Sequence, residues 1–221
     1  MFKATEGYVM VGADYSQQEP RTLAFVSQDK DLINAYKQGR DIYAFIAMAV
    51  YKVDYEDCLE FYPDGKVNPE GKKRRSSCKS VLLGLMYGRG IGAIAEQLGC
   101  TTKEAQDIKD RFFKSFPNVE KWMSKTISDA KRNGYVETIC GRRRRLPDIQ
   151  LPNYEVTRLD GTEVDSQTER RYLALLRDAR GLKQKNSIIY NARQVGIKIK
   201  DNTGFIAEAE RQAINSVIQG R

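Results

Sequence analysis

Helical patterns follow one another along most of the first 131 residues, and this succession restricts the fold more than any other feature. Each pattern is a stretch with helical spacing of apolar residues, set off by glycine, proline or a capping residue. Between them, residues 62–71 form a loop marked by Pro63, Pro69 and an Asp-Gly pair. The sequence therefore predicts an α+β fold dominated by helices, at 18–27, 30–38, 41–50, 72–87, 91–98, 102–116 and 117–131.

Strands are expected in only a few places. Residues 8–13 are a short apolar run that ends at Asp14, which predicts a buried strand with a carboxylate at its tip. Residues 135–139 alternate as a strand does, and residues 154–159 and 162–164 flank Asp160-Gly161, which indicates a hairpin. A charged helix at 169–183, a polar basic region and a last helix at 207–219 complete the prediction.

The positive charge is concentrated in two clusters. The formal net charge is +8, from 37 basic and 29 acidic residues. Residues 71–95 contain six basic residues and no acid, and residues 131–148 contain six basic residues against Glu137 and Asp148. Such clusters fit contacts with a polyanion such as nucleic acid, and they also fit a solvated surface.

Composition excludes several classes of protein. The chain has no histidine, which excludes Ser–His and Cys–His catalysis. The four cysteines are widely spaced and contain no C-x-x-C pair, so a zinc site is not expected and reduced core thiols are. There is no run of about 18 apolar residues and no secretion signal, so the expected location is the cytoplasm and no membrane partner is expected.

Asp14 is the first candidate for chemistry, within the block Asp14-Tyr15-Ser16-Gln17-Gln18-Glu19-Pro20-Arg21. A carboxylate at the tip of a strand can ligate a divalent ion together with a neighbouring backbone carbonyl, and Mg²⁺ prefers such oxygen ligands. The alternative is that Asp14 or Ser16 caps the helix that starts near Gln18. Composition alone favours the cap.

The second candidate is one stripe of the helix at 72–87. Arg75, Lys79, Leu83 and Tyr87 recur every four residues, so they lie along one face over about 18 Å. Two cations, an apolar residue and an aromatic ring could hold a triphosphate at one end and a base at the other. An amphipathic helix with a basic edge would have the same pattern.

Four ordered blocks resemble the motifs of family A DNA polymerases, the DNA polymerase I type. The Asp14–Arg21 block is similar to motif A, and Arg75-x-x-x-Lys79-x-x-x-Leu83-Gly84-x-x-Tyr87-Gly88 is similar to motif B on the mobile fingers helix. Residues 134–147 resemble a palm segment, and Arg211-x-x-x-Asn215-x-x-x-Gln219 resembles the palm helix that follows. The resemblance implies a fingers subdomain and a partial palm of the right-hand fold, in a phage or prophage version of the enzyme.

The resemblance also implies a role for each matching residue. Asp14 and the Tyr15 carbonyl would bind Mg²⁺ in a two-metal site, and Arg75 and Lys79 would hold the triphosphate, with Lys79 the candidate general acid. Glu19 would exclude a ribose 2′-OH. The substrate-binding set is Glu19, Gln17, Leu83, Tyr87 and Tyr43, and the DNA-binding set is Arg21, Gly88, Arg211, Asn215 and Gln219.

The chain departs from the family pattern at three places. Leu83 stands where the family has Phe or Tyr, and Tyr43 stands where it has a histidine that contacts the triphosphate. The connection at 151–205 is longer than in the bacterial enzyme. The expected domains are therefore a partial palm at 1–30, fingers at 31–133 with the motif B helix at 72–88, a palm segment at 134–150, an insertion at 151–205 and the start of a primer–template helix at 206–221.

The family's third motif, an H-D-E that supplies a second metal-binding aspartate, does not occur in these 221 residues. A two-metal site needs both carboxylates. We therefore expect a DNA-directed DNA polymerase that uses primer–template DNA and dNTPs, whose isolated 221-residue part is inactive. The alternative is a non-catalytic nucleic-acid-binding remnant. A single-subunit RNA polymerase is disfavoured by Glu19.

Overall fold

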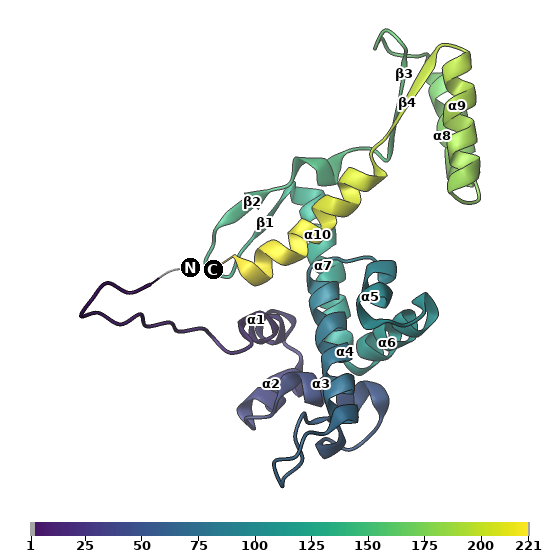
Figure 1. The fold of residues 1–221 in the computed structure, drawn as a ribbon. Coiled ribbons are helices and arrows are strands. Elements are labelled where there is room, and N and C mark those ends of the chain that lie inside the picture. Colours follow the sequence, from purple (N-terminus) through teal and green to yellow (C-terminus); the bar gives the residue numbers. More distant parts are fainter. Residues whose placement is uncertain (1–2, 221) are drawn as a thin grey trace. The chain divides into compact units, whose positions relative to one another are not determined.

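A computed structural model describes residues 3–220 of the chain (Figure 1). The chain forms two compact units, Met1–Ser124 and Lys125–Arg221, with the boundary inside one helix. Helices predominate in both units, which confirms the predicted α+β, mainly helical fold class. Within the described part, no helix has the length and apolar character that crossing a membrane would require.

The first unit is built of helices around a pair formed by α3 and α4. Its elements are α1 (Gln18–Ser27), α2 (Lys30–Lys37), α3 (Ile42–Tyr51), the 3-10 turn η1 (Glu56–Cys58), α4 (Pro69–Met86), α5 (Ile91–Leu98), α6 (Thr102–Ser115) and α7 (Pro117–Asn133), which continues into the second unit. The core includes Ile42, Ile46 and Val50 of α3, which are buried together with Val81 and Leu82 of α4. The long helix α4 is thereby fixed on α3.

Local capping explains why these helices start where the sequence predicts. The Asp29 side chain accepts from the backbone N–H groups that open α2, and Asp41 accepts from Ala44 N at the start of α3. At α4 the Asn68 side chain accepts from Gly71 N at 2.9 Å. Thr101 and Glu104 form a reciprocal capping box at α6. The seven helices predicted for this part of the chain are all present, with ends within three residues of those expected.

The predicted strand at residues 8–13 is absent. These residues have no strand conformation in the structure, and Val9 and Val11 are 85% and 89% exposed. They form part of the extended segment that precedes α1, drawn in purple in Figure 1. A strand is stabilised by pairing with a neighbour, and none of the described residues pairs with this segment. The prediction of a buried strand is therefore wrong.

The second unit combines two antiparallel ribbons with helices. Strand β1 (Tyr135–Glu137) pairs with β2 (Arg143–Arg145), and β3 (Tyr154–Arg158) pairs with β4 (Ile197–Asp201). The remaining elements are the 3-10 turn η2 (Pro147–Gln150) and the helices α8 (Ser166–Asp178), α9 (Leu182–Gln194) and α10 (Thr203–Gln219). The helix α10 packs against β1 and η2, and this contact forms the core of its half of the unit.

The predicted hairpin around Asp160-Gly161 is correct in its turn and wrong in its main pairing. The turn exists, because Arg158 N donates to Thr162 O at 2.8 Å, and Gly161 has φ +87°. Beyond it, only an isolated bridge joins Thr157 to Glu163. Strand β3 pairs instead with β4, in the register Val156↔Ile199, because the alternating apolar residues of β4 complete a small core.

The predicted helix at 169–183 is divided into two. Helix α8 ends at Asp178, and Gly181 (φ +82°) precedes α9 in a conformation that favours glycine. Part of the polar basic region expected after residue 183 is therefore helical. Buried Ala192, with Ile188 and Ile189 packed beside it, turns one face of α9 toward a core that it shares with Val156, Leu176 and Ile199. Helices α8 and α9 lie side by side along the β3–β4 ribbon (Figure 1).

The cysteines agree in part with the prediction of reduced core thiols. All four are free, and Cys58 and Cys78 are buried in the first unit. Burial raises the pKa of the Cys78 thiol to about 12, so this thiol stays protonated. Cys140 is exposed, so the prediction fails for this residue.

Replacing Gly71 with alanine is expected to destabilise the start of α4. A Cβ at this position would lie 2.1 Å from the Leu59 carbonyl oxygen and 2.5 Å from Asn68 Nδ2, so it would also disturb the Asn68 cap. Overpacking and a lost cap each cost about 1–3 kcal/mol, so we expect the free energy of unfolding to fall by about 2–4 kcal/mol, measured by thermal and urea denaturation followed by circular dichroism.

The matched control is Gly92→Ala in α5. No atom lies within 4 Å of a Cβ built at Gly92, which is helical, so this change should raise stability by about 0.5–1 kcal/mol. Equal stability of the Gly71→Ala variant and the unchanged chain would contradict the packing described at the α4 N-terminus.

Candidate functional site

The stripe predicted on α4 exists and begins with two cations. Arg75 is half-buried and Lys79, one turn further along, is exposed. Another face of α4 carries the buried residues Cys78, Val81 and Leu82, and the helix packs against α3. Because this face is anchored, the cationic stripe has a fixed direction relative to α3. Leu83 and Tyr87, the other members of the stripe, are both half-buried.

Tyr43 of α3 lies beside both cations. Its ring is buried, with 6% of the side chain exposed. The Arg75 guanidinium carbon lies 5.5 Å from the ring centroid and the Lys79 Nζ lies 5.8 Å from it. Burial raises the pKa of the Tyr43 hydroxyl, so the ring stays neutral and can attract both cations through its π-face. The structure thus brings together three of the residues predicted for the triphosphate site.

Asp41 holds the Arg75 guanidinium in place, and the sequence analysis missed this partner. Its Oδ2 accepts from Arg75 Nη2 at 2.9 Å and from Nε at 3.2 Å, and its Oδ1 accepts from Ala44 N at the start of α3. Burial alone would lower the pKa of Arg75, but the hydrogen bond and charge of Asp41 outweigh it and raise this pKa. The N-cap position of Asp41 could have been found from the sequence, but its contact with a residue 34 positions away could not.

Glu19 and Tyr87 meet at the other end of the stripe. The Tyr87 hydroxyl lies 2.6 Å and 2.7 Å from the two Glu19 carboxylate oxygens, and it donates to this carboxylate. Tyr87 follows the last residue of α4, and Glu19 belongs to the first turn of α1. A hydrogen bond across 68 residues of sequence therefore joins the predicted sugar gate to the residue predicted beside the templating base.

Gly88 continues the chain in a conformation that favours glycine, with φ +64°. Its N–H donates to Leu85 O at 3.1 Å, which closes the C-terminus of α4. The chain can therefore turn sharply after Tyr87 without a side chain next to the tyrosine.

Asp14 and Tyr15 lie in the extended segment before α1, and both are exposed. Asp14 has no hydrogen bond or ion pair with any residue among 3–220. The capping alternative fails, because the N-cap residue of α1 is Gln17, in a left-handed conformation and without a side-chain cap. A free carboxylate and its neighbouring carbonyl are oxygen donors of the type that Mg²⁺ prefers. No group of three acidic, cysteine or histidine side chains in the described range could hold a metal ion.

Arg21 and Gln17 belong to the same segment and the start of α1. The Arg21 Nε donates to Ser16 O at 3.0 Å, and its guanidinium carbon lies 4.5 Å from the centroid of the Tyr36 ring. These contacts fix the entrance to α1. The second contact places the Arg21 cation against a side chain of α2.

The remaining predicted residues lie on α10 of the second unit. Arg211, Asn215 and Gln219 recur every four residues and so share one face of the helix. Arg211 donates to the Glu208 carboxylate through Nε at 3.0 Å and through Nη2. Asn215 is half-buried and Gln219 is exposed. Nearby, Gln212 accepts from Arg144 of β2 at 2.9 Å, which links this helix to the arginine-rich ribbon.

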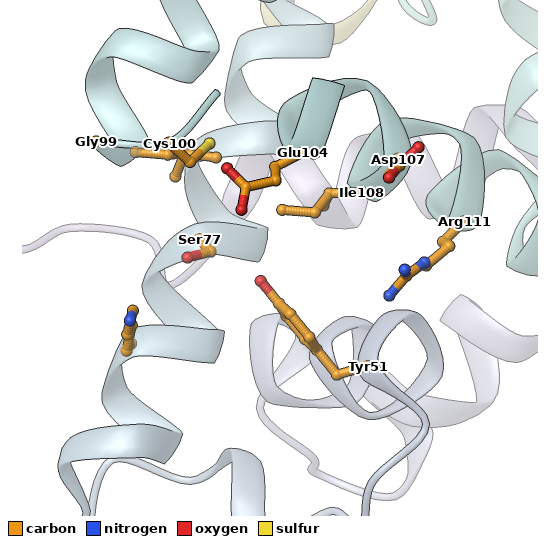
Figure 2. A pocket seen from close by; sticks show the side chains of 10 residues that line it. Tyr51, Ser77, Gly99, Cys100, Glu104, Asp107, Ile108 and Arg111 are labelled. Carbon is orange, nitrogen blue, oxygen red and sulfur yellow. The ribbon is translucent and has the colours of Figure 1, made fainter. Parts of the chain in front are cut away.

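A separate hollow of about 390 Å³ lies beside α4 (Figure 2). It is reached by Lys73 and Ser77, which are two residues from Arg75 on either side and therefore face away from it. Figure 2 shows Tyr51, Ser77 and Glu104 around this hollow, together with Asp107 and Arg111. Acidic and basic groups are mixed here, and none of the predicted site residues contributes.

Comparison with known proteins gives one consistent result. The model of the family described as DNA polymerase family A matches residues 1–164. The thermostable DNA polymerase I of Thermus aquaticus is 38% identical over 149 residues, and the DNA polymerase I of Geobacillus stearothermophilus is 37% identical over 149 residues. Each match covers 67% of this chain and 16% of the relative, so the chain spans about a sixth of the length of these relatives.

A solved structure is similar across nearly the whole chain. It is described as the POL domain of Pol1 from M. smegmatis in complex with DNA primer-template and dNTP. The similarity has a TM-score of 0.60 at 25% sequence identity, and it covers 94% of this chain and 26% of that one. The right-hand fold expected from the motifs, with fingers and part of a palm, is consistent with this match.

Proposed function

Because the chain belongs to DNA polymerase family A, we propose that it forms part of a DNA-directed DNA polymerase, which adds deoxynucleotides to the 3′ end of a primer. The observation that supports this most strongly is that Arg75 and Lys79 of α4 lie together beside Tyr43 of α3, with the Glu19–Tyr87 pair at the end of α4. Cytoplasmic location in a bacterial or phage-infected cell, and use in DNA replication, belong to the same proposal.

Arg75 and Lys79 would bind the triphosphate of the incoming dNTP. Phosphoryl transfer is accelerated mainly by positive charge fixed around the reacting phosphates, and both cations are fixed against the Tyr43 ring. Asp41 orients the Arg75 guanidinium through Nε and Nη2, and Nη1, which lies 3.9 Å from Glu60 Oε2, would turn to a phosphate when dNTP binds. Lys79, exposed and close to the same ring, would donate a proton to the pyrophosphate that leaves.

Glu19 would exclude ribonucleotides. A carboxylate held by the Tyr87 hydroxyl at 2.6 Å has little freedom to move aside for a 2′-OH. Tyr87 would in turn lie beside the templating base, with Gly88 leaving room after it, and Leu83 would contact the sugar from the same face of α4. Sugar choice and base position would therefore be coupled through one hydrogen bond.

Asp14 and the Tyr15 carbonyl would hold Mg²⁺. Asp14 and Tyr15 are exposed, and Asp14 has no partner among residues 3–220, which fits a ligand for an ion that is shared with substrate phosphates. When bound, the metal pair would stabilise charge on the attacking and leaving oxygens. A second carboxylate is required for this pair. Gln17, Arg21, Arg211, Asn215 and Gln219 would contact the primer–template near the growing end.

The test is primer extension by two proteins. The first is the 221-residue chain alone, and the second is the fused chain, in which these residues are continued by the H-D-E palm segment of a family A polymerase. With Mg²⁺, dNTPs and a primed template, we expect no product from the first protein and extension from the second. Product from the first protein would show that the reaction proceeds without the second metal-binding aspartate. A fused chain that folds, binds DNA and yet gives no product would support a non-catalytic remnant.

A further inference from the structure

Residues 179–200 contain six basic residues and no acid. The basic residues are Arg180, Lys183, Lys185, Arg193, Lys198 and Lys200. This stretch covers α9 and most of β4, and it lies beyond residue 164, where the match to the family model ends. The neighbouring helix α8 differs, because it contains both signs of charge, including an Arg177–Asp178 pair at 3.0 Å. Residues 179–200, unlike α8, therefore contain no acid that could offset their basic residues.

The second unit also carries most of the net charge of the protein. Residues 1–124 contain 18 basic and 17 acidic residues, a difference of +1. Residues 125–221 contain 19 basic and 12 acidic residues, a difference of +7, and the two differences sum to the +8 of the whole chain. An acid-free helix in this unit thus adds to a positive field that attracts polyanions.

One face of α9 presents cations around an exposed aromatic ring. Lys183, Asn186, Tyr190 and Arg193 follow each other at spacings of three, four and three residues, so they share a face. All four are exposed, and 65% of Tyr190 is accessible. The opposite face is the one that carries Ala192 into the core, with Lys185 drawn inward over the Tyr154 ring at 5.8 Å. Packing therefore fixes the polar face toward solvent.

Lys198 of β4 lies near the Arg193 end of this face. Arg193 and Lys198 line the same hollow of about 360 Å³ between α9 and β4. Within residues 3–220, no carboxylate pairs with Lys183, Arg193 or Lys198. By contrast, the next lysine of the strand, Lys200, is paired with Glu155 at 3.4 Å. We call Lys183, Asn186, Tyr190, Arg193 and Lys198 the α9 face.

We propose that the α9 face binds the phosphate backbone of duplex DNA. Lys183 and Arg193 are about 15 Å apart along the helix, which suits phosphates on the two sides of a groove about 12 Å wide. Asn186 and the Tyr190 hydroxyl lie between them and can donate to phosphate or sugar oxygens. The α9 face would add sequence-independent phosphate contacts to the DNA contacts proposed for α10. It is independent of the chemistry at Asp14 and Lys79.

The test measures DNA affinity with the triple variant K183Q/R193Q/K198Q of the full 221-residue chain. Binding to a fluorescein-labelled primer–template with a 25-base-pair duplex is followed by anisotropy at several NaCl concentrations. Each phosphate contact contributes about 0.9 to the slope of log K against log[NaCl], so the slope should fall by two to three. We expect the dissociation constant at low salt to rise at least 30-fold, and Tyr190→Phe to change it about threefold.

The control triple is K103Q/K114Q/K121Q, which removes the same charge from exposed positions on α6 and α7. A smaller change in slope, below one, is expected for it. The proposal is overturned if the two triple variants change the slope equally, or if K183Q/R193Q/K198Q leaves the slope unchanged. It is also overturned if K183Q/R193Q/K198Q weakens binding only to single-stranded DNA or to phosphatidylglycerol vesicles. Since binding is measured without extension, an inactive polymerase with normal DNA binding would contradict only the proposed function.

Discussion

Replacing Lys79 with alanine in the fused chain is expected to lower the rate of single-nucleotide incorporation about 10²–10⁴-fold, the range by which a positioned general acid accelerates a reaction. Lys79 is exposed and makes no ion pair with any described residue, so its removal leaves the core of the first unit intact. Its Nζ lies 5.8 Å from the Tyr43 ring centroid, beside Arg75. The loss should therefore appear in the reaction with the triphosphate and not in folding.

The measurement is rapid-quench incorporation of one dNTP over a range of concentrations. A general acid acts in the transition state, so the maximal rate should fall more than the apparent affinity for dNTP. Arg75→Ala should instead weaken dNTP affinity, because the role proposed for Arg75 is to bind phosphate and not to donate a proton. If Lys79→Ala mainly weakened dNTP affinity and Arg75→Ala mainly lowered the maximal rate, the roles proposed for the two residues would be exchanged.

Lys73→Ala is the matched control. It is the same substitution on the same helix, but Lys73 faces the hollow of Figure 2, away from Arg75 and Lys79. Incorporation by this variant should stay within about threefold of the unchanged fused chain, since a distant exposed charge contributes little. A loss in Lys73→Ala as large as that in Lys79→Ala would mean that the net charge of α4 matters, and that no single cation does.

The helices were predictable because their signals are local. Helices 18–27 and 91–98 have the observed bounds, since apolar spacing indicates both and Gly90 and Gly99 flank the second. The strand at 8–13 failed for the opposite reason. Its apolar residues indicate a strand, but a strand also needs a partner, and the described residues provide none. Likewise, nothing near Asp160-Gly161 indicates that β3 pairs with residues some 40 positions later.

For the candidate site, the sequence predicted a stripe on one helix but not the contacts of its residues. Arg75 and Lys79 lie one turn apart on α4, as their spacing predicts, and Tyr87 directly follows the helix. The Asp41–Arg75 ion pair and the Glu19–Tyr87 hydrogen bond join residues 34 and 68 positions apart. Such contacts depend on how α1 and α3 pack around α4, and one sequence does not determine this packing. The α9 face could not be predicted either, because most of α9 was expected to be a polar basic region and not a helix.

Replacing Asp14 with alanine in the fused chain is expected to lower the rate of incorporation more than 10³-fold. Asp14 makes no hydrogen bond or ion pair with any residue among 3–220, and it does not cap α1. Its removal therefore costs no protein contact, and thermal stability should not change. Loss of a metal ligand costs several kcal/mol of transition-state stabilisation, and each 1.4 kcal/mol corresponds to about tenfold in rate. Glu6→Ala, which removes an exposed carboxylate from the same extended segment, should retain the full rate.

Metal titration separates a ligand from a merely nearby charge. If Asp14 binds Mg²⁺, residual incorporation by the Asp14→Ala variant should need a higher Mg²⁺ concentration, whereas its affinity for DNA should be unchanged. If incorporation by Asp14→Ala stayed near normal, the metal assignment would be wrong. If DNA affinity fell together with the rate at an unchanged Mg²⁺ requirement, Asp14 would act in positioning the primer–template. The Mg²⁺ requirement and the DNA affinity therefore show whether Asp14 acts on the metal or on the DNA, because only the loss of a metal ligand raises the Mg²⁺ concentration that the reaction needs.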